Sequence, residues 1–144
     1  MISERFVPYE MKTSVLKVVS YDQKNPVGWL ENAYWNGPKR FSNLTQMLFL
    51  IDELMDGLDY PQRATVPRSL APKQERHVEQ AVEEDWKPEH WLASFRVSIL
   101  FRQNASWQGS IQWLEQNSAS QFRSVLELIQ LLDSVLAEYD GTEK

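Results

Sequence analysis

The chain has 144 residues, of which 42% are hydrophobic and 24% are charged. This composition is typical of a folded protein, and we expect a single domain over residues 1–144. The net charge of −5 repels phosphate groups and anionic lipids, so duplex DNA and membranes are not expected as partners. The absence of cysteine excludes disulfides, thiolate metal sites and cysteine nucleophiles.

The sequence lacks the features of a protein that enters or crosses a membrane. No window approaches the roughly 18 apolar residues that a membrane-spanning helix needs, and residues 1–8 contain no continuous apolar run. A chain without cysteine also suits a reducing compartment. We therefore expect a cytoplasmic protein.

The first predicted element is a β-hairpin. Residues 13–21 read TSVLKVVSY, and after a polar stretch the chain continues at 26–35 as PVGWLENAYW. Two runs rich in β-branched and aromatic residues, joined by turn formers, predict paired strands. Apolar residues from Phe41 to Leu58 then recur at steps of three and four, which predicts an amphipathic helix that begins after Gly37 and Pro38.

Residues 59–90 are predicted to form a connector, because four prolines interrupt any long element. Trp86 and Trp91 are expected to anchor it to the core. Its two histidines, His77 and His90, lack the spacing of a helical metal site, so no metal is predicted. The connector also contains the one basic cluster of the sequence: Arg63, Arg68, Lys73 and Arg76.

A second hairpin and a second helix follow the connector. Residues 94–102 read SFRVSILFR and residues 107–115 read WQGSIQWLE, with apolar and polar residues alternating. An amphipathic pattern then runs from Phe122 to Leu136, and Ser118 with Gln121 resembles a capping box at its start.

A constant shift of 81 positions superposes the second pattern on the first. The matching pairs are Gly28 and Gly109, Phe41 and Phe122, Leu50 and Leu131, and Asp52 and Asp133. We infer an internal duplication of a ββα unit, with repeat one at 13–58 and repeat two at 91–139. The predicted fold is α+β, an antiparallel sheet of about four strands with two helices on one face and a pseudo-twofold axis.

Few residues of the chain are arranged for catalysis. If the predicted helices pair about the axis, the carboxylates of Asp52 and Asp133 approach each other and form an acid–base pair. The simpler alternative is that each aspartate caps a helix or forms an ion pair. Neither a nucleophile elbow nor a glycine-rich phosphate loop is present. We therefore predict a non-enzymatic protein without catalytic residues, metal or cofactor.

The turn of the second hairpin, Asn-Ala-Ser-Trp-Gln-Gly at 104–109, is similar to the Asn/Asp-x-Ser-x-x-Gly element with which PilZ domains hold cyclic di-GMP. The resemblance covers six residues. It implies a ligand turn that consists of Arg102, Asn104, Ser106 and Gly109. Two features depart from the family: Arg63 and Arg68 are one residue too far apart for its Arg-x-x-x-Arg element, and a helix follows the hairpin in place of a six-stranded barrel. The structural alternative is an ordinary turn in which Gly109 matches Gly28.

The first hairpin is predicted to carry an exposed apolar patch. If Leu16 and Val18 point into the core, alternation sends the following residues to the opposite face: Val19, Tyr21, Val27 and Trp29. Their counterparts in the second hairpin are mostly polar. Contiguous apolar surface usually marks an interface, unless the connector or residues 6–9 cover it.

Three functions remain open at this point. The leading prediction is an interaction or regulatory module that binds a protein partner or a second copy of itself through the patch. The second is a small-ligand or cyclic-nucleotide sensor with its site between the two units or at the hairpin turns. The third is binding of single-stranded nucleic acid by aromatic stacking. A sensor requires a pocket with convergent polar groups, whereas an interaction module can use a flat apolar surface.

Overall fold

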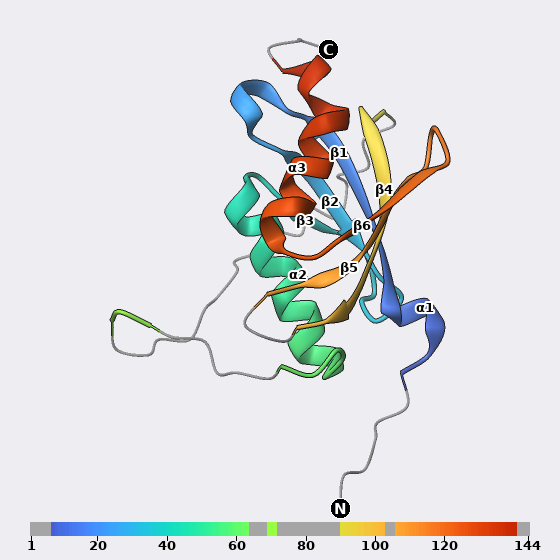
Figure 1. Ribbon diagram of the computed structural model, residues 1–144, viewed down its shortest axis with the longest axis vertical. Coiled ribbons are helices and arrows are strands. Elements are labelled where there is room, and N and C mark those ends of the chain that lie inside the picture. Colours follow the sequence, from blue (N-terminus) through green and yellow to red (C-terminus); the bar gives the residue numbers. More distant parts are fainter. Residues whose placement is uncertain (1–6, 64–68, 72–89, 103–105, 141–144) are drawn as a thin grey trace, which may run out of the picture.

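The computed structural model describes residues 7–63, 69–71, 90–102 and 106–140. These residues form an α+β fold with one antiparallel sheet of six strands in the order β3-β2-β1-β4-β5-β6. Two long helices, α2 and α3, lie on the same face of the sheet and run in opposite directions (Figure 1). None of the helices in the described part of the chain is long and apolar enough to cross a membrane.

Each half of the chain contributes three strands and one long helix. In the first half a short helix, α1 (Tyr9–Lys12), precedes β1 (Thr13–Ser20), β2 (Val27–Glu31), β3 (Lys39–Phe41) and α2 (Leu44–Leu58). The second half contains β4 (Ala93–Phe101), β5 (Gln108–Trp113), β6 (Ser118–Phe122) and α3 (Val125–Leu136). Both predicted hairpins are present, as β1 with β2 and β4 with β5.

The prediction of about four strands was wrong, because β3 and β6 lie where the helices were expected to begin. Phe41 and Phe122 continue the helical spacing of apolar residues, but they are buried from these strands. The helices begin at the N-caps Asn43 and Ser124, whose side chains accept hydrogen bonds from the backbone N–H groups three residues later. Ser118 and Gln121 are therefore strand residues and not a capping box.

Strand pairing in the two halves has the same register. Gly28 lies opposite Val18 and Phe41, and the residues 81 positions later are paired in the same way: Gly109 lies opposite Ile99 and Phe122. A Cβ atom on Gly28 would lie 1.9 Å from the Lys17 carbonyl oxygen, and one on Gly109 would lie 2.0 Å from that of Ser98. Only glycine fits there, because the neighbouring strand backbone occupies the space of a side chain.

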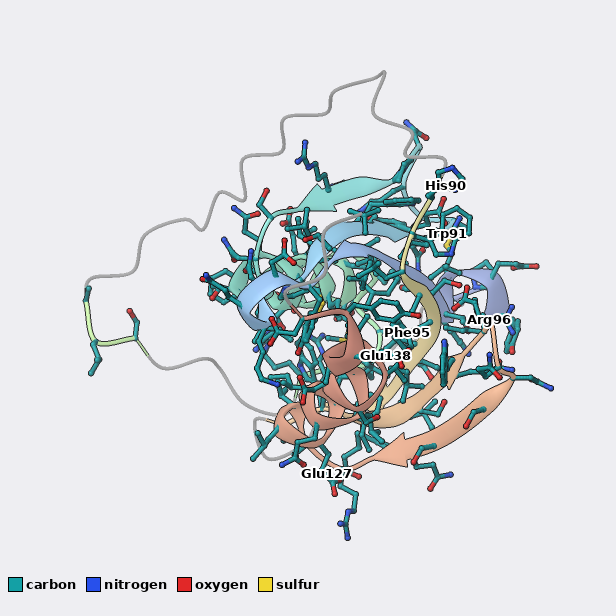
Figure 2. The ribbon with its side chains drawn as sticks, turned by 90° about the horizontal axis from the view of Figure 1, so that it is seen from above. His90, Trp91, Phe95, Arg96, Glu127 and Glu138 are labelled. Atoms are coloured by element: carbon teal, nitrogen blue, oxygen red, sulfur yellow. The ribbon has the colours of Figure 1, made fainter. Side chains whose placement is uncertain are left out.

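The hydrophobic core lies between the sheet and the two helices. Figure 2 shows Phe95 pointing into the layer between β4 and α3, whereas Arg96 points away from it. The fully buried side chains from strands and helices include Leu16, Val18, Leu30, Phe41, Met47, Leu50, Phe95, Phe122, Leu128 and Leu136. Burial of each large apolar side chain stabilises the fold by about 1.5–3 kcal/mol, so this layer dominates its stability.

Candidate functional site

A cavity of about 250 Å³ lies between α2, α3 and the turn of the first hairpin, and we call it the hairpin–helix cavity. Apolar side chains make up most of its wall: Val18, Pro26, Leu44, Met47, Ile129, Leu132 and Leu136. Its polar lining consists of Tyr21, Lys24, Gln130 and Asp133. Each of the three elements thus contributes a wall of the cavity.

Asp133 on α3 accepts hydrogen bonds from two polar side chains of the cavity, Tyr21 and Lys24. The Tyr21 hydroxyl donates a hydrogen bond to Asp133 Oδ1 over 2.7 Å, and Lys24 Nζ donates to the same oxygen over 2.9 Å. The turn is also held by the backbone N–H of Gln23, which donates to Asp140 Oδ1 over 2.7 Å. These contacts fix the hairpin turn on the C-terminal half of α3.

The protonation states of these polar groups are stable at neutral pH. Burial and the hydrogen bond to Asp133 raise the pKa of Tyr21, so the phenol stays neutral. The hydrogen bond with Asp133 raises the pKa of Lys24, and the hydrogen bonds from Lys24 and Tyr21 lower the pKa of Asp133. The cavity rim therefore holds a neutral phenol beside a paired cation and anion.

The end of β4 is attached to α2 by an ionic cluster in which Arg102 and Asp52 are buried. Arg102 is only 3% exposed, and its Nη1 lies 2.7 Å from Asp56 and 3.5 Å from Asp52. Its Nε donates to the carbonyl oxygen of Pro61 over 2.6 Å. Arg63 adds a second guanidinium, 2.6 Å from Asp52. We call these four charged side chains the arginine–aspartate cluster.

Ionic contacts in this cluster shift the pKa values of Asp56 and Arg63. Burial raises the pKa of Asp56, but hydrogen bonds from Arg102 and Arg63 outweigh that effect, so the pKa lies below its ordinary value. Burial likewise lowers the pKa of Arg63, and the contacts with Asp52 and Asp56 more than compensate. Asp56 and Arg63 are therefore both charged at neutral pH.

The two hairpin ends differ at equivalent positions. Tyr21 precedes Arg102 by 81 positions, and Asp52 precedes Asp133 by the same distance, so each hairpin contacts the helix of the other half through matched residues. Pro26, at the wall of the hairpin–helix cavity, corresponds to Trp107. Trp107 is 9% exposed and belongs to the core.

The expected apolar patch on the first hairpin is largely covered. The placement of Tyr21 on the open face was wrong, because a bulge between Val18 and Ser20 breaks the alternation and turns Tyr21 toward α3. Trp29 does lie away from the core layer but is 5% exposed, and Val19 and Val27 are half-buried.

Trp91 provides part of the cover over Trp29. The two rings are arranged edge to face with centroids 6.0 Å apart, and Lys17 Nζ lies 4.5 Å from the Trp91 centroid and 5.5 Å from that of Trp29. The expected anchoring of Trp91 to the core was wrong, because Trp91 is 40% exposed and contacts Trp29 on the face away from the core layer. Trp86 lies outside the described residues. The alternative in which the chain covers its own patch accounts for this contact.

The turn that resembles the PilZ element is only partly described. Arg102 is engaged in the arginine–aspartate cluster, and Gly109 lies in β5 against the Ser98 carbonyl. Ser106 is half-buried, and Asn104 lies outside the described residues. The contacts of Arg102 and Gly109 are thus explained by the chain itself.

The remaining candidates contact separate groups. Asp52 binds the two arginines of its cluster while Asp133 binds Tyr21 and Lys24, as the ion-pairing alternative predicts. His90 is exposed, and within the described ranges no three acidic or histidine side chains are grouped as metal ligands. His77, Arg68, Lys73 and Arg76 fall outside the described residues.

No protein-family model, curated protein or solved structure matches the chain. The second sequence-based prediction placed a ligand between the two units or at the hairpin turns, where the hairpin–helix cavity lies, but the sequence did not indicate which residues line it. The cavity's one sequence signal was the mismatch of Pro26 with Trp107 under the shift of 81 positions, which replaces a large side chain with a small one.

Proposed function

We propose that this protein binds a small, mostly apolar molecule in the hairpin–helix cavity and acts as a ligand-binding or sensing domain. The observation that carries the proposal is the distribution of side chains in the cavity: apolar walls with polar groups gathered around Asp133. Ligand sites typically combine such walls with a few polar groups that orient the ligand. A flat interface requires no cavity of this kind.

The size of the cavity limits the ligand. Pockets for drug-sized molecules usually have volumes of about 300–1,000 Å³, whereas a cavity of about 150 Å³ holds a benzene ring. The hairpin–helix cavity, at about 250 Å³, lies between these values. We infer a ligand larger than one bare aromatic ring and smaller than a dinucleotide, which disfavours cyclic di-GMP at this site.

The charges at the rim favour an uncharged polar head on the ligand. Lys24 and Asp133 already form an ion pair with an N–O distance of 2.9 Å. A charged head would have to compete with one member of this pair, whereas a hydroxyl or amide group can hydrogen-bond to Tyr21 or Gln130 beside it. The proposed ligand is therefore a compact apolar body with a neutral hydrogen-bonding group.

Binding is favoured over catalysis by the pKa values at the rim. General acids and bases work best when their pKa lies near the working pH. The pKa of Asp133 is lowered and those of Tyr21 and Lys24 are raised, so each moves away from neutrality. We accordingly propose that the cavity holds its ligand without transforming it.

We also infer that the two halves are copies of one unit and that the cavity arose as they diverged. Support comes from the equal register of the strand pairs, the two glycines against a carbonyl, and the N-caps at Asn43 and Ser124, all 81 positions apart. The unit has three strands and a helix. In the second copy Trp107 is large enough to fill the space that Pro26 leaves open in the first.

Benzyl alcohol is a suitable first probe, since it combines one ring with a hydroxyl group. We expect its titration to shift the methyl NMR signals of Met47, Leu132 and Leu136, which line the cavity. Signals from Leu16, in the core but outside the lining, should stay in place. Benzylamine and benzoate, which carry charged heads, should bind at least about tenfold more weakly, a difference of about 1.4 kcal/mol.

The variant Pro26→Trp copies the residue of the second half into the cavity wall and should abolish binding of benzyl alcohol. Thr45→Trp is the matched control, because it adds the same side chain at an exposed position of α2 outside the cavity. Equal binding by both variants, or NMR shifts spread over the surface of the wild type, would show that the cavity is not the site.

A further inference from the structure

The two edges of the sheet carry different kinds of residues. β3 and β6 are the edge strands in the sheet that the structure describes. β3 is three residues long, follows Pro38 and contains Lys39 and Arg40. β6 is five residues long, and its sequence Ser-Ala-Ser-Gln-Phe contains neither a charge nor a proline.

Proteins usually protect edge strands from pairing with other chains by short length, proline and lysine. β3 has all three forms of protection, and its cations would repel those of a second β3. β6 has none of them, and residues 118–121 are exposed along the strand. The positions correspond one to one under the shift of 81, because Pro38, Lys39 and Arg40 precede Ala119, Ser120 and Gln121 by that distance.

An apolar groove accompanies the unprotected edge. A cavity of about 220 Å³ lies between β6 and α3, and its lining includes Trp113, Leu131 and Val135. Leu131 and Val135 are only half-buried, whereas their counterparts on α2, Leu50 and Leu54, are 0% and 3% exposed. In the described part of the chain, α3 therefore has apolar surface beside its sheet edge that α2 lacks.

The first half covers its own helix with local segments. Met11 of α1 and Tyr60 line a small cavity together with Leu54. Tyr34, in the loop between β2 and β3, donates a hydrogen bond from its hydroxyl to the Gly57 carbonyl of α2 over 3.2 Å. The loop between β5 and β6 is shorter and presents Glu115 to Asn117, which are exposed.

We propose that two copies of this chain associate through β6, paired antiparallel about a twofold axis, so that one sheet continues across both copies. In a register centred on the strand, Ser120 faces Ser120 of the second copy and Ala119 faces Gln121. No like charges meet in this pairing, in contrast to two β3 strands. The α3 helices then approach from the same side of the joined sheet and cover Leu131 and Val135.

A second copy is the favoured occupant because the edge is complementary to itself. β6 has no charge with which to select a foreign strand, and both copies bring the same half-buried apolar surface on α3. The isologous contact buries that surface twice in one interface. The proposal does not depend on ligand binding in the hairpin–helix cavity, which lies at the first hairpin.

Sedimentation equilibrium of the full chain tests the proposal. The wild type is expected to be a dimer, and the triple variant Ala119→Pro, Ser120→Lys, Gln121→Arg, which copies the protected edge of β3, is expected to weaken dimerisation at least about a hundredfold. The triple variant Ala71→Pro, Ser69→Lys, Gln62→Arg is the control, since it makes the same changes at exposed positions outside the sheet. A monomeric wild type, or a folded β6 variant that stays dimeric, overturns the proposal.

If the β6 triple variant does not fold, a cross-linking experiment tests whether two copies pair through β6. The chain has no cysteine, so Ser120→Cys introduces a single thiol at the centre of the proposed contact. Mild oxidation should convert this variant to a disulfide-linked dimer, because directly opposed strand residues have Cβ atoms about 4.5–5.5 Å apart. Lys39→Cys, at the equivalent position on β3, should form no disulfide-linked dimer, although it keeps the β6 contact. Equal cross-linking of both variants, or none for Ser120→Cys, contradicts β6 pairing.

Discussion

The ends of the two hairpins perform the same structural task with different chemistry. The second hairpin is attached to α2 by the arginine–aspartate cluster, in which Arg102 is 3% exposed. The first is attached to α3 by the phenol of Tyr21 and the ammonium of Lys24, both bonded to Asp133. At the second end Trp107 belongs to the core, whereas the first end has a cavity beside Pro26. We call them the solid and the hollow hairpin end for this difference.

This comparison explains where a binding site can exist at little cost to stability. Strand register and helix caps are equal in the two halves, so the framework does not depend on the side chains at the hairpin ends. Pro26 and Trp107 stand at matched positions of the two ends, while the strand pairs have the same register. The equivalence of the two halves can be tested by substitutions at matched positions.

The largest effect is expected from the matched phenylalanines of β3 and β6. Phe41→Ala and Phe122→Ala should each lower the free energy of unfolding by about 3–5 kcal/mol, the usual cost of removing a buried phenylalanine. Both residues are almost fully buried, with 0% and 1% exposure. Urea unfolding measures the change. If either variant loses less than about 0.5 kcal/mol, the halves are not equivalent at this position.

The second-largest loss of stability is expected at the solid hairpin end, where Arg102 contacts α2. Arg102→Met should lower the free energy of unfolding by about 3 kcal/mol, because the change removes a buried guanidinium from the buried Asp52 and from the exposed Asp56. Arg63 remains near Asp52 and keeps the loss at the low end of the usual range. Thermal and urea unfolding should agree on the loss. Arg40→Met, at an exposed strand position, is the control and should change little.

A smaller loss is expected at the hollow end. Tyr21→Phe removes the hydroxyl that donates to Asp133 but keeps the ring, so the free energy of unfolding should fall by about 1 kcal/mol. Asp133 retains its contact with Lys24. A loss as large as that of Arg102→Met would mean that the two ends contribute equally, contrary to the difference in their burial and charge.

The smallest expected effect is a difference in the pH dependence of stability between the N-termini of α2 and α3. At α3 the Glu127 side chain accepts hydrogen bonds from Arg123, which holds the pKa of Glu127 at about 2, below its ordinary value of 4.5. This contribution is therefore complete above pH 4.5 and is lost as the pH falls toward 2. At α2 the equivalent residue is Gln46, which does not titrate.

Glu127→Gln should therefore reduce the acid dependence of stability by about one proton between pH 4.5 and pH 2. The measurement is urea unfolding at a series of pH values, in wild type and variant. Gln46→Glu, the reverse exchange at α2, should add an acid-dependent loss. An unchanged pH profile for Glu127→Gln would assign the acid sensitivity to other carboxylates.

The regular elements were predictable from the sequence, and the deviations were not. The hairpins and helices have clear periods of two and 3.6 residues, and the shift of 81 positions links them. The strands β3 and β6 were not predicted, because Phe41 and Phe122 fit the helical spacing of the apolar residues that follow them. Tyr21 was placed on the wrong face, because a bulge changes the alternation of side chains and no residue pattern in the sequence indicates it.

Contacts between distant segments were the second source of error. The cover of Trp29 by Trp91 and the pairing of Tyr21 with Asp133 join residues that no local pattern connects. The cavity depends on volumes, and a hydrophobic pattern records which residues are buried but not how well they fill the space. Only the mismatch of Pro26 with Trp107 carried information about it.

The central pairing of β1 with β4 also has a consequence for the rate of folding. Within each half the strands pair over short distances in sequence, as Val18 does with Gly28, whereas β1 and β4 join Val15 to Arg96. Closing this roughly eightfold longer loop costs about 2 kcal/mol more in chain entropy. We therefore expect each half to assemble its hairpin and helix early, and the union of the halves along β1 and β4 to determine how fast the protein folds.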